Sequence, residues 1–155
     1  MTNLDIPVTT LDGRVTTLGD LLQGRSALVV NVASKCGLTP QYTGLVRLQD
    51  TFAPRGFTVI GVPCNQFMGQ EPGTADEIQE FCSVTYGVDF PLLEKADVNG
   101  DDRHPLYRAL IGDGEDVKWN FEKFTVNADG EVTARFAPQI EPESAEVVAA
   151  IEKNL

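Results

Sequence analysis

Apolar residues along the chain form short uninterrupted runs that alternate with helical patterns. Residues 26–33 (SALVVNVA) and 57–62 (FTVIGV) are nearly continuous apolar runs, a pattern typical of strands that are covered on both faces. Between these runs, Leu45, Leu48 and Phe52 recur at helical spacing. The pattern therefore predicts a β-α-β unit whose two strands are parallel.

Two further segments alternate between apolar and polar residues and predict hairpins. Residues 8–18 alternate around Asp12-Gly13, a dipeptide whose backbone suits a tight turn. Residues 123–136 form two strand-like runs that are joined at residues 127–130. We expect one hairpin before the β-α-β unit and one near the end of the chain.

Residues that commonly begin helices predict three more helices. Thr74 and Glu77 have the spacing of a capping box, and the helix that they begin carries Cys82 on its apolar face. Residues 104–111 (HPLYRALI) predict a short helix, and Pro142 is expected to open a terminal helix. The order of elements predicts an α/β fold in which helices flank a central mixed sheet.

The chain is long enough for one core and shows no sign of a second. It has 155 residues, of which 42% are hydrophobic. No internal repeat, low-complexity segment or linker divides it. We therefore expect residues 1–155 to form a single domain.

Charge and hydropathy exclude several classes of partner. The formal net charge is −11, which opposes binding to nucleic acids or to anionic lipid surfaces. No apolar run approaches the roughly 18 residues of a membrane span, and the first ten residues lack the basic and apolar regions of a secretory signal. These features predict a cytoplasmic protein without stable membrane association.

Cys36 lies where the first apolar run meets a helix start at Thr39-Pro40. The unpaired N–H groups of a helix N-terminus favour a thiolate over a thiol, and Lys35 adds positive charge. A thiolate is the form that attacks peroxides and disulfides. A buried structural cysteine is the alternative, but Lys35 and Gly37 are not typical core neighbours. We interpret Cys36 as a candidate nucleophile.

A dithiol motif is absent, because Thr39 occupies the position three residues after Cys36. Cys36 therefore works alone or with a cysteine from elsewhere in the chain. Cys82 lies on a helix that can fray, and a resolving cysteine must move to reach its partner. We therefore favour Cys82 over Cys64, which we interpret as a buried thiol at a strand end.

Three segments, NVASKCGLTPQYTGL, GVPCNQFMGQEPG and KWNFEKFTVNADGEV, resemble the signature segments of the glutathione peroxidase family in its non-selenium, cysteine type. The resemblance implies a thioredoxin-like fold and the reduction of hydrogen peroxide or organic hydroperoxides. It also implies a catalytic set of Cys36, Gln70, Trp119 and Asn120. Gln70, Trp119 and Asn120 can all donate hydrogen bonds without bringing a charge, which suits the stabilisation of a thiolate.

The resemblance extends to the branch of the family that uses thioredoxin as its reductant, because EIQEFC (77–82) is similar to the segment that carries the resolving cysteine there. It implies that Cys82 forms a disulfide with oxidised Cys36. The segment between Tyr107 and Trp119 is short where tetrameric members of that family carry a longer subunit-contact loop, so the resemblance favours a monomer. A basic patch for glutathione, formed by Lys35, Arg47 or Lys118, stays open as an alternative.

Other functions remain open from the sequence. A peroxide sensor that passes oxidation to a partner protein needs the same reactive thiol, and a one-cysteine enzyme would use glutathione. A metal site built from Cys36, Cys64, Cys82 and His104 lacks the paired ligand spacing of such sites. We therefore predict neither a metal nor another cofactor, and we assign His104 a capping or surface role.

Overall fold

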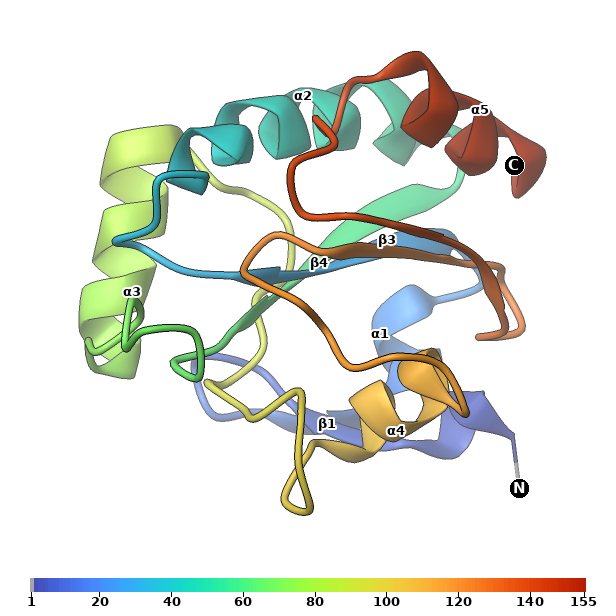
Figure 1. Ribbon diagram of the computed structural model, residues 1–155. Helices are drawn as coiled ribbons and strands as arrows, with labels where there is room; N and C mark the ends of the chain where they lie inside the picture. The colour runs from blue at the N-terminus through green and yellow to red at the C-terminus, as the bar shows by residue number, and fades with distance from the viewer. Residues whose placement is uncertain (1) are drawn as a thin grey trace.

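The computed structural model describes residues 2–155 and contains a mixed four-stranded sheet (Figure 1). The strands lie in the order β4-β3-β5-β6. Their bounds are β3 Ser26–Val32, β4 Phe57–Pro63, β5 Lys123–Val126 and β6 Val132–Phe136. Strands β3 and β4 are parallel, whereas β5 is antiparallel to both of its neighbours. The prediction of a central mixed sheet is confirmed.

Strands β3 and β4 are buried along their whole length, which explains their continuous apolar sequences. They are connected by α2 (Tyr42–Phe52), which is preceded by the 3-10 helix η2 (Thr39–Gln41) and followed by η3 (Ala53–Arg55). Gly56 then ends the connection with a φ of +91°, a conformation that glycine adopts without strain. The predicted β-α-β unit is confirmed.

Helices cover both faces of the sheet, as Figure 1 shows. Helices α2 and α5 (Ala145–Lys153) lie on one side, and α1 (Leu18–Leu22) and α4 (Pro105–Ile111) lie on the other. Each side has its own apolar core. None of the helices in residues 2–155 is both long enough and apolar enough to cross a bilayer.

The N-terminal hairpin forms a separate two-stranded sheet of β1 (Pro7–Thr9) and β2 (Val15–Thr17), and it follows the 3-10 helix η1 (Asn3–Asp5). The side chain of Thr10 closes the turn, since its Oγ1 accepts from the backbone N–H of Arg14 at 3.0 Å and donates to Asp12. The backbone N–H of Leu11 donates to the carbonyl of Leu92 at 2.9 Å, which joins the hairpin to the segment beside β4. The predicted hairpin is confirmed.

Helix α3 (Ala75–Phe81) begins with the predicted capping box. Thr74 Oγ1 accepts from the Glu77 N–H at 3.2 Å, and Glu77 Oε1 accepts from the Thr74 N–H at 2.9 Å. The chain then widens into a π-helix, η4 (Cys82–Tyr86). Cys82 therefore opens a turn with i→i+5 bonding, a geometry that is rare and often found at functional sites.

The last helix starts later than predicted. Pro142 lies in a turn, and α5 begins at Ala145 with Ser144 as its N-cap. Proline fixes φ at a value that suits both a turn and the first turn of a helix. The prediction from Pro142 therefore placed the start of the helix three residues too early. Helix α1 was not predicted, because five residues are too few for a periodic signal.

Gly61 of β4 has no side chain, so Phe90 and Leu92 pack directly on the strand at this position. A Cβ at Gly61 would lie 2.7 Å from Leu92 Cδ2 and 3.3 Å from Phe90 Cε1. We therefore expect Gly61→Ala to lower the free energy of unfolding by about 1 to 3 kcal/mol, measured by urea denaturation. Gly37→Ala is the matched control, because its added methyl group would meet no atom within 4 Å. Equal losses in the two variants would contradict the close approach.

Candidate active site

Cys36 lies in the loop between β3 and η2 and is 8% exposed. Thr39 closes this loop, because its Oγ1 accepts from the Cys36 N–H at 3.0 Å and donates to the carbonyl of Ala33 at 2.8 Å. The backbone N–H of Leu38 donates to Cys36 Sγ at 3.3 Å. The thiol therefore stands at the predicted junction, with a backbone donor directed at the sulfur.

A second loop, which follows β4, is tied to the loop of Cys36. The Lys35 N–H donates to the carbonyl of Gln70 at 3.0 Å, and the Ser34 N–H donates to Glu71 Oε1 at 3.1 Å. Glu71 is fully buried, and this burial raises the pKa of its carboxyl. These bonds fix the backbone of Gln70 against that of Lys35, so the side chain of Gln70 is not needed to tie the two loops together.

Trp119 and Asn120 come from a third loop, just before β5. Asn120 is fully buried, and its Nδ2 donates to Gln70 Oε1 at 2.9 Å. Trp119 packs against the core that contains Cys36, and its ring centroid lies 5.7 Å from that of Phe67. The ends of β3 and β4 and the start of β5 thus bring the three loops to one edge of the sheet.

Within residues 2–155, the hydrogen bond to the sulfur of Cys36 comes from the backbone of Leu38. The structure shows no such bond from the side chains of Gln70, Trp119 or Asn120. Donation by these side chains to the sulfur therefore stays a prediction. Catalytic hydrogen bonds often tighten only when the substrate is bound.

Cys82 is fully buried in the same apolar core as Cys36. Its Sγ donates to the hydroxyl of Tyr42 at 3.4 Å, and burial raises the pKa of its thiol. The Tyr42 ring lies 5.3 Å from the ring of Tyr86 in η4 and 5.5 Å from that of Phe121, which directly follows Asn120. Tyr42 therefore connects the turn of Cys82 with the loop of Asn120.

Cys64 is also fully buried, but it belongs to the core on the other side of the sheet. Its Sγ lies 3.5 Å from Gln66 Oε1, and burial raises the pKa of its thiol. The structure thus separates Cys64 from the core that Cys36 and Cys82 share.

Comparison with known proteins identifies the family. A family model described as glutathione peroxidase matches residues 4–111. The chain belongs to the glutathione peroxidase family. The matched residues include Cys36, Gln70 and Cys82, but they end before Trp119 and Asn120.

Two relatives and one solved structure agree with this assignment. The hydroperoxy fatty acid reductase Gpx2 of Synechocystis sp. is 55% identical over 98% of each chain. The thioredoxin/glutathione peroxidase BtuE of Escherichia coli is 44% identical over 94% of this chain and 92% of its own. The crystal structure of Trgpx in apo form has a TM-score of 0.74 and 35% identity, over 99% of this chain and 98% of that chain. The protein is a peroxidase.

A structure of a thiol:disulfide interchange protein, a thioredoxin family protein from Chlorobium tepidum, has a TM-score of 0.70 at 20% identity. The alignment covers 99% of this chain and 95% of that chain. At this identity the likeness shows the fold alone. It confirms that the peroxidase has the predicted thioredoxin-like fold.

The loop of the peroxidase that carries Asn120 contains a strained backbone and a buried cation. Phe121 has a φ of +68°, a conformation that is uncommon outside glycine and that persists only where the surroundings impose it. The ammonium of Lys123, which is fully buried, donates to the carbonyls of Phe121 at 2.6 Å and Pro138 at 3.1 Å. Burial lowers the pKa of Lys123 to about 8.

His104 caps helix α4, because its Nδ1 accepts from the backbone N–H of Leu106 at 3.0 Å. Its capping role is confirmed. In the part of the chain that the structure describes, no group of three or more His, Cys, Asp or Glu side chains is placed to hold a metal ion. The alternative of a metal site built from the three cysteines and His104 is therefore not supported.

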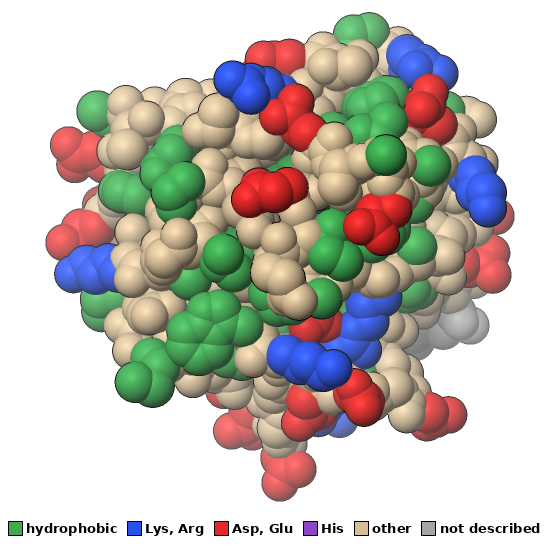
Figure 2. Space-filling model, turned by 45° about the horizontal axis from the view of Figure 1, so that its top comes forward, with side chains coloured by type: hydrophobic (Ala, Val, Ile, Leu, Met, Phe, Trp, Pro, Cys, Tyr) green, Lys and Arg blue, Asp and Glu red, His purple; other side chains and the backbone are tan. Residues whose placement is uncertain are grey.

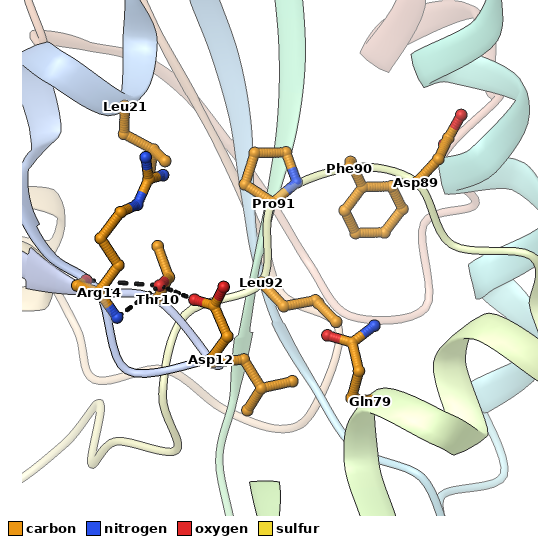
Figure 3. Close-up of a pocket in the computed structure, with 10 residues that line it drawn as sticks. Thr10, Asp12, Arg14, Leu21, Gln79, Asp89, Phe90, Pro91 and Leu92 are labelled. Carbon is orange, nitrogen blue, oxygen red and sulfur yellow. Dashed lines mark hydrogen bonds between the residues drawn. The ribbon is translucent and has the colours of Figure 1, made fainter. Parts of the chain in front are cut away.

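A cleft between the hairpin turn, α3 and the segment Asp89–Leu92 is shown in Figure 3. Thr10, Asp12 and Arg14 form one wall, and Gln79 of α3 reaches toward it from the other side. Cys36, Gln70, Trp119 and Asn120 do not line this cleft. The cleft is therefore separate from the candidate active site.

Among the buried residues near the site that sequence analysis missed are Tyr42, Glu71 and Lys123. Glu71 and Lys123 had a signal, because Glu71 is a charged residue beside the predicted site residue Gln70 and Lys123 is a charged residue at the start of a predicted strand. Tyr42 had none, because an aromatic residue at the start of an apolar helix face reads as an ordinary core residue.

The buried Lys123 gives the peroxidase a pH-dependent stability. Its pKa of about 8 lies below the ordinary 10.5, so the unfolded chain binds more protons between these values. The cost of burying the ammonium therefore disappears as the pH rises through this interval. We expect the free energy of unfolding of the wild type, relative to Lys123→Met, to rise by roughly 2 kcal/mol between pH 7.5 and 10 in urea denaturation.

The buried cysteines and tyrosines also make the free energy of unfolding depend on pH, in the opposite direction to Lys123. Both proteins share these residues, so their contribution cancels in the difference between wild type and Lys123→Met. Lys153→Met is the control, because Lys153 is exposed on α5. A difference between wild type and Lys123→Met that stays constant over this pH range would show that the ammonium carries no burial cost.

Proposed function

We propose that Cys36 is the peroxidatic residue of a thiol peroxidase that reduces hydroperoxides. The Cys36 thiolate attacks the terminal oxygen of the peroxide, the O–O bond breaks, and water or an alcohol leaves after taking up a proton. Cys36 is left as a sulfenic acid. The observation that carries this proposal is the placement of one thiol, with a backbone N–H directed at its sulfur, beside the hydrogen-bonded pair of Gln70 and Asn120.

Gln70, Trp119 and Asn120 support the reaction as neutral hydrogen-bond donors. The bond from Asn120 Nδ2 to Gln70 Oε1 fixes the orientation of both amides. Within residues 2–155, no hydrogen bond is formed by the N–H groups of Gln70 Nε2 and Trp119 Nε1. These N–H groups are therefore able to stabilise the thiolate before the attack and the departing oxygen during it.

Cys82 is the proposed resolving residue. Its thiol attacks the sulfur of the Cys36 sulfenic acid, an S–S bond forms, and the hydroxyl leaves as water with the thiol proton. Two observations support Cys82 over Cys64. Cys82 shares a core with Cys36, and it begins a π-turn, whereas Cys64 lies in the other core.

Thioredoxin is the proposed reductant of the disulfide, through a mixed disulfide with one of its thiols. The name of the Escherichia coli relative pairs thioredoxin with glutathione. A basic patch for glutathione has little support here. Arg47 pairs with Glu143 at 3.2 Å and Lys118 with Glu115 at 3.0 Å, and acidic and basic side chains are interspersed on the face shown in Figure 2.

The proposed substrates include hydroperoxides of fatty acids as well as hydrogen peroxide. The relative with 55% identity is named a hydroperoxy fatty acid reductase. We also propose that the single domain acts as a cytoplasmic monomer. The three cysteines are free in the structure, as expected in a compartment that keeps thiols reduced.

The cysteine variants test the cycle. We expect Cys36→Ser to abolish peroxide consumption. Cys82→Ser should keep one rapid oxidation of Cys36 but lose at least about 90% of thioredoxin-driven turnover, because the sulfenic acid finds no internal thiol. Steady-state peroxide consumption with thioredoxin and its reductase measures turnover. Non-reducing peptide mapping after one equivalent of hydrogen peroxide should show a disulfide between Cys36 and Cys82.

Cys64→Ser is the matched control, a third buried cysteine that should keep turnover within about twofold of wild type. A disulfide to Cys64 would reverse the assignment of the resolving residue. Full turnover of Cys82→Ser with glutathione would support a one-cysteine enzyme. Oxidation of Cys36 without turnover by either reductant would instead support a peroxide sensor.

A further inference from the structure

Asn31 is a fully buried amide near the C-terminal end of the apolar strand β3. Its Nδ2 donates to the carbonyl of Trp119 at 3.0 Å, and its Oδ1 accepts from the N–H of Glu122 at 3.1 Å. Its backbone carbonyl accepts from the N–H of Phe121 at 2.7 Å. One residue thus holds three peptide groups of the four-residue segment that contains Asn120.

The formation of strand β3 does not require the side chain of Asn31. Burying an amide is unfavourable unless its polar groups are paired, and the neighbouring positions of β3 are filled by valine. A valine in place of Asn31 would keep the strand, but the Trp119 carbonyl and the Glu122 N–H would lose their partner. The amide therefore serves the loop that it binds.

This loop requires an external support. Phe121 has a φ of +68°, a conformation that the loop would not keep without contacts to the rest of the protein. The side chain of Asn120 must also stay aligned with that of Gln70. The ammonium of Lys123 holds the Phe121 carbonyl, while Asn31 holds the Phe121 N–H. The two peptide groups that flank the Cα of Phe121 are thereby fixed.

Asn31 also connects the loop with the thiol. It lies one residue before the end of β3 at Val32, and residues 33–35 lead from there to Cys36. We propose that Asn31 is a positioning residue of the peroxidase, which sets Trp119 and Asn120 relative to Cys36. The inference rests on the role that the proposed function gives to Asn120.

The test compares the oxidation rate of Cys36 in variants of the full chain. Asn31→Leu removes both side-chain bonds and keeps the branched shape of the side chain, and Asn31→Thr is a smaller change that suits a strand. Rapid quenching with hydrogen peroxide, followed by mass mapping of Cys36, gives the second-order rate constant. We expect roughly a 10- to 100-fold loss, since small misplacements of catalytic groups have effects of this size.

A second readout separates positioning from stability. Trp119 is the single tryptophan of the chain, so its fluorescence emission reports on this loop alone. We expect Asn31→Leu to shift the emission to longer wavelengths. Thr58→Val is the control, because Thr58 is a buried polar residue of the adjacent strand that bonds to Gln49 and not to the loop. It should lower the melting temperature without changing the emission or the rate.

A double-mutant cycle with Asn120→Ala links the two residues. If Asn31 acts by placing this loop, Asn31→Leu should slow the Asn120→Ala protein clearly less than it slows the wild type, because only Trp119 is then left to be misplaced. The inference about Asn31 would be overturned if the folded Asn31→Leu protein had the wild-type rate. It would also be overturned if Asn31→Leu slowed the Asn120→Ala protein as much as it slows the wild type. Neither result would affect the proposed function. A wild-type rate in Asn120→Ala would overturn the proposed role of Asn120 as well.

If neither Asn31 variant folds, amide hydrogen exchange in the wild-type protein tests whether Asn31 holds the loop. The amides of Phe121 and Glu122, which donate to Asn31, should then exchange as slowly as those in the centre of β3. Fast exchange of these two amides would show that Asn31 does not hold the loop, and would overturn the inference.

Discussion

Burial of strand β3 on both faces is the constraint on which the other parts of the molecule depend. The strand pairs with β4 on one side and β5 on the other, and it separates the two apolar cores. Its end delivers Cys36, while the loops after β4 and before β5 meet at the same edge. A strand that is fixed on all sides allows side chains from three distant segments to keep their positions relative to one thiol.

The two thiols of the proposed cycle have different physical requirements. Cys36 lies in a loop that Thr39 and Leu38 hold in place, so the attack on peroxide needs no large rearrangement. Cys82 is buried with its sulfur bonded to Tyr42, so the second step requires the π-turn to open. Reaction with peroxide and formation of the disulfide are therefore governed by different parts of the fold.

Local patterns predicted most of the fold, because strands with two buried faces, capping boxes and tight turns leave their signals within a few residues. The contacts of Asn31 were beyond such patterns. Its partner Trp119 lies 88 positions away in the sequence, and an asparagine within an apolar run gives no indication of where its amide will bond. The same holds for Lys123, whose bond to Pro138 depends on how the chain returns to the site. Buried polar pairs are set by tertiary structure, and they support the loop of Trp119 and Asn120.

The attachments on both sides of Cys82 have a kinetic consequence. Glu71 is bound to Ser34 before α3, and Leu92 is bridged to Gly61 after η4. When η4 opens, the chain that carries Cys82 is thus a closed tether with both ends fixed to the sheet that carries Cys36. A thiol on a short tether meets its target at an effective concentration in the millimolar range. In the proposed cycle, capture of the sulfenic acid by Cys82 is then a first-order process, independent of the concentration of external thiols.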